Sequence, residues 1–178
     1  MTDGTDSPPA AELARRYFGH VSDRDPDAMA AMVAADVVEE FVVLGTYHGR
    51  EALRSFFEEL FAAVPDSSFE VEAIHDVDET TAIGQWQLTG TFEGGPFEGI
   101  EPTGEPLDFR GIDVLEFEDR TAADGSEERL LAHNTIYYDG LTFARQIGLL
   151  PDEDSLPDRA MLAGFNGLTK LRKQLQDV

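Results

Sequence analysis

The chain of 178 residues has no cysteine, which excludes disulfide bonds, cysteine-ligated zinc and a thiol nucleophile. It also lacks any stretch near the roughly 18 apolar residues of a membrane-spanning helix, and its first residues form no apolar signal segment. We therefore expect a soluble protein of the cytoplasm. No P-loop, GxGxxG, GxSxG or HExxH motif is present, and the histidines are not spaced like metal ligands, so we expect no metal site.

Lysine is nearly absent, because Lys170 and Lys173 are the only two and the other basic residues are arginines. The chain has 36 acidic residues and 13 basic ones, and its formal net charge is -23. This excess argues against nucleic acids and anionic membrane surfaces as partners. An excess of acidic residues with few lysines is typical of proteins from a cytosol at very high salt. At 1 M salt the Debye length falls to ~3 Å, so the repulsion among acidic residues is tolerable. We favour this halophilic origin over that of an ordinary acidic protein.

The hydrophobic pattern predicts three helices near the N-terminus and a helical tail at the C-terminus. The second helix has a clear start, with Asp25 as N-cap and Pro26 at the first helical position. The predicted helices cover 8–21, the segment from Pro26 to about Val33, 50–63, and a tail whose apolar residues recur at helical spacing from Leu162 to Leu175.

Residues 37–44 are predicted to form an early strand, followed by a turn over Gly45 to Gly49. Four more strands are expected over 69–77, 80–93, 106–118 and 129–138, with a polar loop over 119–128 whose turn is Asp124-Gly125. This order indicates an α+β fold, in which the helices pack on one face of a curved antiparallel sheet.

One strand face carries a carboxylate among apolar side chains. Alternate residues of a strand share a face, so Asp113 lies with Phe109, Leu115 and Phe117. A charged, unpaired carboxylate there costs several kcal/mol, so Asp113 should be protonated, paired or held in a wet pocket. A raised pKa of this kind suits a general acid or base near neutral pH. The alternatives are that this face is exposed, or that Asp113 pairs with an arginine.

The last strand supplies further candidates. Asn134 and Tyr138 share a face and are hydrogen-bonding groups that could line a pocket beside Asp113. Asp139 is a candidate second carboxylate, and its alternative role is the N-cap of the helix that follows.

Three more residues have weaker signals. Trp86, on the strand 80–93, could shape the pocket. Tyr17, on the apolar stripe of the first helix, could place its hydroxyl there, with core packing as the alternative. His75 lies on an apolar strand face and is predicted to be a satisfied core histidine rather than a ligand.

Five short segments resemble, in the same order, segments of a known family. They are Asp23–Ala28 with the residues up to Val38, Tyr47–Leu53, Gly90–Gly104, Arg110–Asp113 and Tyr137–Pro151. Together they span about 10 to 151. The family is that of the SnoaL-like polyketide (ester) cyclases, within the NTF2-like superfamily.

The resemblance implies a cone-shaped α+β barrel with an internal pocket, and a homodimer formed through the sheet. It also implies a cofactor-free enzyme that closes a ring by intramolecular aldol condensation of a polyketide ester, with an aspartate as acid and base. Asp113 matches the strand aspartate of the family, and Asp139 matches the aspartate after the final strand. Tyr17 matches the helix-one tyrosine of ketosteroid isomerase, a relative, but the catalytic base of that enzyme falls near Phe41, which argues against isomerase activity.

The expected organisation is a domain over 1–151 with a C-terminal helical extension over 152–178, which lies outside the resemblance. Two functions remain open. One is an enzyme that abstracts a proton next to a carbonyl, with Asp113 or Asp139 as base and no cofactor. The other is a non-catalytic module that binds a small apolar ligand or serves dimeric assembly.

Overall fold

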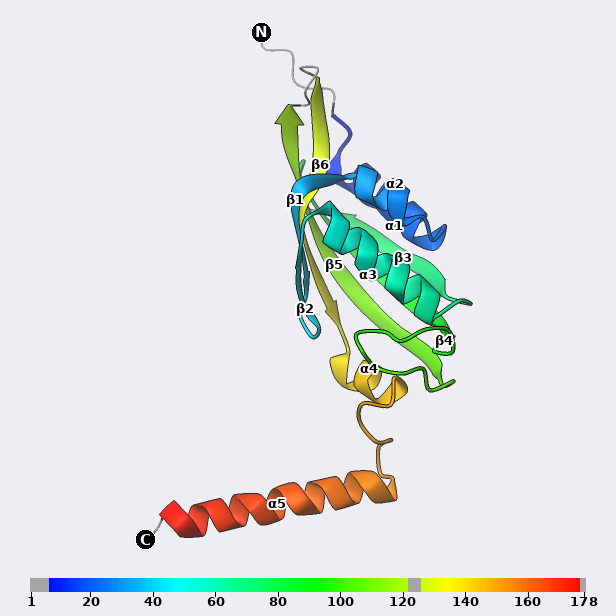
Figure 1. Cartoon of the computed structure of the whole chain (residues 1–178). Helices are drawn as coiled ribbons and strands as arrows, with labels where there is room; N and C mark the ends of the chain where they lie inside the picture. The colour runs from blue at the N-terminus through cyan, green and yellow to red at the C-terminus, as the bar shows by residue number, and fades with distance from the viewer. Residues whose placement is uncertain (1–6, 122–125, 177–178) are drawn as a thin grey trace.

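The computed structural model describes residues 7–121 and 126–176 (Figure 1). The predicted Asp124-Gly125 turn lies outside these residues. The elements in chain order are α1 (Ala10–Ser22), α2 (Pro26–Ala31), β1 (Val33–Phe41), β2 (Gly45–His48), α3 (Arg50–Ala63), β3 (Ser68–Asp76), β4 (Thr81–Thr91), β5 (Pro106–Thr121), β6 (Glu127–Tyr138), α4 (Gly140–Gln146) and α5 (Leu156–Gln176).

Helix α2 begins where the sequence indicates. The Asp25 side chain caps α2 by accepting a hydrogen bond from the Ala28 N–H at 3.0 Å, and Pro26 opens the helix. Helix α1 starts slightly later than predicted, since Pro9 is its N-cap and has an extended backbone. Gly49 precedes α3 with φ +83°, a conformation that glycine adopts without strain.

Six strands within the described part of the chain form one open sheet in the order β2-β1-β6-β5-β4-β3. The predicted α+β class is confirmed, but the sheet does not close into a barrel, because β2 and β3 remain as edges. The expectation of a wholly antiparallel sheet is wrong, since β1 pairs with β6 in parallel. The early strand β1 pairs with β6, which is the last strand in the sequence. The local sequence pattern contains no signal for such a long-range pairing.

Two segments that were predicted to be loop or turn are strands. The predicted turn at Gly45 to Gly49 contains the short strand β2, which forms a hairpin with β1. Within the predicted loop over 119–128, residues 119–121 belong to β5 and residues 127–128 belong to β6. There Arg129 stands opposite Asp119 and donates to both of its carboxylate oxygens at 2.8 Å. This charged cross-strand pair stabilises the extension, although the composition is that of a loop.

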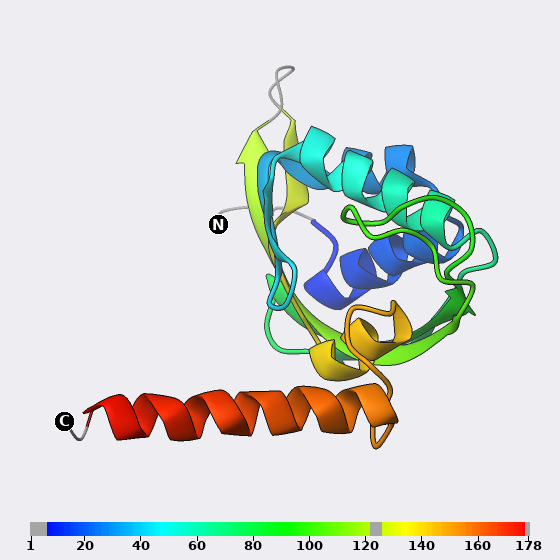
Figure 2. The same cartoon turned by 60° about the horizontal axis from the view of Figure 1, so that its bottom comes forward.

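Helices α1, α2 and α3 cover the concave inner face of the sheet, and the core lies between them (Figures 1 and 2). Helix α4 follows β6 directly and buries Phe143 and Ile147 against the same core. Helix α5 extends past the domain in both views. No helix within residues 7–121 and 126–176 is long and apolar enough to cross a membrane.

Candidate functional site

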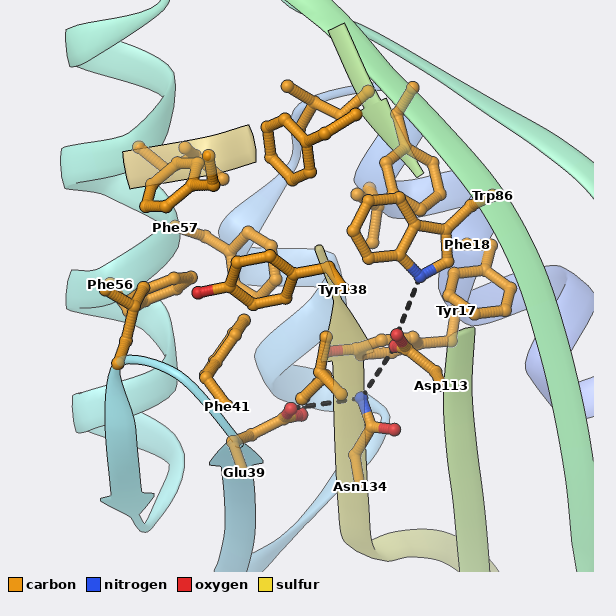
Figure 3. A pocket seen from close by; sticks show the side chains of 18 of the residues that line it. Tyr17, Phe18, Glu39, Phe41, Phe56, Phe57, Trp86, Asp113, Asn134 and Tyr138 are labelled. Atoms are coloured by element: carbon orange, nitrogen blue, oxygen red, sulfur yellow. Dashed lines mark hydrogen bonds between the residues drawn. The ribbon is translucent and has the colours of Figure 1, made fainter. Parts of the chain in front are cut away.

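A cavity with about 70 Å³ of free space lies between the helices and the inner face of the sheet (Figure 3). Its walls are almost wholly apolar, and aromatic rings from α3, β4, β5 and α4 supply much of them. Against these rings stand two carboxyl groups, those of Glu39 and Asp113, and the amide of Asn134. Representative wall residues are Phe41, Phe56, Phe57, Trp86, Phe109 and Phe143.

Asp113 lies on the inner face of β5 and is 5% exposed, as strand parity predicts. Its two oxygens are held by different strands: the Trp86 indole N–H of β4 donates to Oδ1 at 2.7 Å, and the Asn134 amide of β6 donates to Oδ2 at 2.9 Å. Among the described residues no arginine pairs with it, so that alternative is wrong. Both oxygens of the carboxylate accept hydrogen bonds from neutral donors. Within the described part of the chain no cation neutralises its negative charge, so the carboxylate can act as a base.

Gly111 makes room for the indole that holds Asp113. It stands opposite Trp86 in the β4–β5 register. A Cβ atom at this position would lie 2.2 Å from Cζ2 of the indole, closer than such atoms approach in real structures. A residue without a side chain is therefore required for Trp86 to lie across β5 and reach Asp113.

Glu39 is a second buried carboxyl group, which the sequence analysis missed. It is 1% exposed on the inner face of β1, where it accepts from the Tyr17 hydroxyl at 3.1 Å and from the Asn134 amide at 3.0 Å. The signal was available, because Val37, Glu39 and Phe41 alternate on one strand face. It is the same pattern that singled out Asp113, but the alternation was not applied to this strand, where Glu39 and Glu40 are adjacent and only Glu39 faces inward.

The Asn134 side chain joins the two carboxyl groups. Its single Nδ2 atom donates to Glu39 on one side and to Asp113 on the other, as the dashed lines in Figure 3 show. Three adjacent strands, β1, β6 and β5, thus each contribute one member of a buried polar row. The row lies against the cavity, so both acids can face the same bound molecule.

The pKa values of both acids are raised. Burial, and then the negative charge of Asp113, raise the pKa of Glu39 to about 8, while hydrogen bonds from Tyr17 and Asn134 oppose the rise. Burial raises the pKa of Asp113 to about 6, against the hydrogen bonds from Asn134 and Trp86. Near neutral pH the pair therefore holds one proton, mainly on Glu39, and one negative charge, mainly on Asp113.

Two tyrosines complete the polar part of the site. Tyr17 is 1% exposed, and burial followed by the charge of Glu39 raises its pKa, so it remains a hydrogen-bond donor. The Tyr138 hydroxyl is buried and has no hydrogen-bond partner within the described residues. Figure 3 shows it pointing into the cavity toward Phe56 and Phe57. It is therefore a free donor for a ligand oxygen.

Asp139, the other predicted carboxylate, lies outside the cavity lining. It is exposed and caps α4, accepting from the Leu141 and Thr142 N–H groups at 3.1 Å and from the Thr142 hydroxyl at 2.7 Å. These hydrogen bonds lower its pKa. Its position directly after β6 explains this role, which was the alternative reading of the Asp-Gly sequence.

The prediction that His75 is a core residue is wrong, because its side chain is exposed. A bulge between Val71 and Ala73 shifts the pairing of β3 with β4 and reverses the faces of the residues that follow. Ile74 packs toward the core in place of His75. The described residues contain no group of three or more side chains of His, Cys, Asp or Glu placed to hold a metal ion.

Structures of the same fold come from several bacteria. A candidate SnoaL-like polyketide cyclase from Jannaschia sp. superposes with a TM-score of 0.64 at 22% identity, covering 83% of this chain and 100% of that one. A candidate hydroxylase from Streptomyces galilaeus gives 0.61 at 19% identity, covering 92% and 94%. A protein with a ketosteroid isomerase-like fold from Catenulispora acidiphila, in complex with trimethylamine, gives 0.58 at 17%, covering 77% and 92%.

No curated protein has a significantly similar sequence. The model of the SnoaL-like domain, however, matches residues 14–124, well over half of the chain. This match includes most of α1, with Tyr17, and the whole of β1 with Glu39, β4 with Trp86 and β5 with Asp113. The chain belongs to the SnoaL-like family and has its NTF2-like, ketosteroid isomerase-like fold.

Proposed function

We propose that this protein is a cofactor-free acid–base enzyme of the cyclase type, which acts next to a carbonyl group in a small apolar ester or ketone. The observation that carries the proposal is the pair of buried carboxyl groups, Glu39 and Asp113, bridged by Asn134 on the wall of an apolar cavity. Proton transfer at neutral pH requires an acid and a base whose pKa values differ because their surroundings differ.

In this proposal Asp113 is the base. Its carboxylate removes a proton from the carbon next to the carbonyl, and the electron pair of that C–H bond forms an enolate. The Tyr138 hydroxyl, which is free to donate, stabilises the enolate oxygen. In an aldol-type ring closure the enolate carbon then attacks a second carbonyl, and the new alkoxide takes the proton of Glu39. Transfer of a proton from Asp113 to Glu39 restores the starting state.

The size of the cavity limits the substrate. A cavity of about 150 Å³ accepts benzene, whereas the free space here is about 70 Å³. Aromatic side chains of the wall must therefore move aside when a ring-sized molecule enters. Phe97, in the segment between β4 and β5, and Phe143 of α4 contact one another across this wall and are the expected moving parts.

The test is hydrogen exchange at carbon. The protein is incubated in D₂O with a panel of small apolar ketones and esters, and loss of the proton next to the carbonyl is followed by NMR. Asp113→Asn should reduce the rate by about 10²–10⁴-fold, the usual contribution of a positioned base. The matched control is Asp139→Asn, the same change at an exposed carboxylate, and it should retain the wild-type rate. Exchange that Asp113→Asn leaves intact would refute the proposal.

The second candidate is a non-catalytic binding module. It is favoured by the unpartnered Tyr138 hydroxyl in an apolar cavity and by a neighbour of the same fold that holds trimethylamine. Neighbours named as cyclase and as hydroxylase illustrate that the fold alone does not fix the chemistry. A module of this kind would show ligand-dependent thermal stabilisation with the same panel and no exchange at carbon in the wild-type protein.

A further inference from the structure

The cavity combines aromatic walls with acidic groups. Of the nineteen described residues that line it, eleven have aromatic side chains and none is a lysine, arginine or histidine. Its two acidic residues, Glu39 and Asp113, are 1% and 5% exposed. A ligand in this cavity therefore meets ring faces and carboxyl groups, and no positively charged side chain among the described residues.

The negative charge of the two acids has no counterion in the part of the chain that the structure describes. Asp113 accepts hydrogen bonds from the Trp86 indole and the Asn134 amide, and Glu39 accepts from the Tyr17 hydroxyl and the same amide. These donors are neutral, and no basic side chain among the described residues lowers the pKa of either acid. A buried charge without a counterion is costly. A ligand that brings a positive charge therefore gains more from this cavity than a neutral ligand of the same shape.

The aromatic rings suit the same kind of ligand. The face of a ring attracts a cation that lies within about 6 Å of its centre. Phe41 follows Glu39 on the inner face of β1, and Trp86 donates to Asp113 at 2.7 Å, so each acid has a ring beside it. Tyr138 lies in the same cavity (Figure 3). Rings next to buried carboxyl groups favour a cation whose outer atoms are carbon.

A metal ion does not fit these walls. Calcium takes about 6–8 oxygen ligands, and magnesium retains several water molecules. The described residues contain no group of three or more His, Cys, Asp or Glu side chains placed to hold a metal ion. An aromatic wall cannot replace the lost water ligands, so the observations favour an organic cation.

The surface beside the cavity is also acidic. Glu98 is exposed between β4 and β5, where its N–H donates to Glu59 at 2.6 Å and its carboxylate accepts from the Tyr47 hydroxyl at 2.6 Å. Its neighbour Phe97 lines the cavity. Burial, and then the charge of Glu98, raise the pKa of Tyr138. Negative charge on this side raises the local concentration of cations and lowers that of anions.

We propose that the cavity binds a small tertiary or quaternary ammonium group, with its charge beside Glu39 and Asp113 and its methyl groups against the aromatic rings. The free space is about 70 Å³, and at about 10–15 Å³ for each water-sized group it holds about five such groups. A tetramethylammonium ion is of this size.

This inference deepens the proposed function and rests on it for the identity of the site. In an enzyme the ammonium group belongs to the ketone or ester, and its charge also stabilises the enolate that forms beside it. In a binding module the ammonium compound is the ligand itself.

Two probes of equal size test the role of charge. Tetramethylammonium and tert-butanol have the same number of non-hydrogen atoms and the same tetrahedral shape, but only the first is charged. Each is titrated at neutral pH and constant ionic strength, and binding is followed by the fluorescence of Trp86, the only tryptophan. The wild type should bind tetramethylammonium more tightly by about tenfold or more. Equal binding, tighter binding of tert-butanol, or no saturable change with tetramethylammonium would overturn the proposal.

Paired substitutions test which acids matter. Asp113→Asn with Glu39→Gln preserves the size of both side chains and should abolish the preference, while tert-butanol still binds. Asp139→Asn with Glu70→Gln is the matched control, because it removes two charges from exposed positions and should keep the preference. Phe41→Leu removes one ring face and should weaken tetramethylammonium binding several-fold more than tert-butanol binding. A preference that survives the buried pair, that the exposed pair abolishes, or that Phe41→Leu leaves unchanged would refute the inference.

This inference and the proposed enzyme activity can fail separately. Hydrogen exchange at carbon in neutral ketones, with no binding of tetramethylammonium, would refute the inference and support the enzyme. Binding of tetramethylammonium with no exchange in any ketone or ester would support the ligand class and refute the enzyme.

Discussion

The substitution Glu39→Gln should make the protein more stable at alkaline pH, although Glu39 is buried and hydrogen-bonded. The pKa of Glu39 rises from 4.5 to about 8 on folding. The folded state therefore holds the proton more tightly than the unfolded chain. The stability that this group contributes is fully present below about pH 4.5 and is lost as the pH rises through about 8.

The size of the effect follows from the shift. At 1.36 kcal/mol per pKa unit, the full loss is on the order of 5 kcal/mol. Glutamine resembles the protonated form of Glu39 and does not titrate. The variant therefore does not lose this stability as the pH rises. Its amide would face the Asn134 amide and lose one hydrogen bond, a pH-independent penalty of about 1 kcal/mol. Glu39→Gln should then be slightly less stable than the wild type at pH 5 and about 2–4 kcal/mol more stable at pH 9.

Urea denaturation at fixed salt from pH 5 to pH 9 measures the difference in the free energy of unfolding. The difference between the two proteins cancels the repulsion among the other acids, which both share. In the Asp113→Asn background the pH dependence should become shallower, because the charge of Asp113 is the second cause of the raised pKa. Parallel pH curves for the wild type and Glu39→Gln would show that Glu39 does not hold a proton in the folded state.

Three further predictions concern other parts of the chain. Gly111→Ala should cost about 1–3 kcal/mol by overpacking and shift the fluorescence of Trp86, the only tryptophan, because the new Cβ would meet the indole at 2.2 Å; an unchanged spectrum would contradict this. Asp139→Ala should lower stability by about 1 kcal/mol through loss of the α4 cap and leave hydrogen exchange at carbon unaffected; loss of exchange would restore Asp139 as a catalytic candidate. For a chain with a net charge of -23, raising KCl from 0.1 M to 2 M should increase the melting temperature, whereas a salt-independent melting temperature would argue against halophilic adaptation.

Patterning along the chain predicted the elements whose faces differ in polarity. Asp113 was found because its strand alternates cleanly, and the same rule applied to β1 would have found Glu39. His75 shows where the rule fails, since one extra residue at the β3 bulge reverses the faces beyond it. The parallel pairing of β1 with β6 and the contact of Asn134 with both acids depend on long-range packing, which no local pattern encodes.

The bridge made by Asn134 has a consequence for the order in which the protein folds. Its hydrogen bond to Glu39 joins residues 95 positions apart, and its bond to Asp113 joins residues 21 apart. Contacts between residues distant in sequence form slowly, because the entropy of closing a long loop is lost before any contact is gained. The β5–β6 hairpin can bring Asn134 to Asp113 early, but Glu39 arrives only when β1 docks on the finished hairpin. The proton shared by the two acids is therefore acquired at the last stage of sheet assembly, and its uptake should be a kinetic marker of the completed fold.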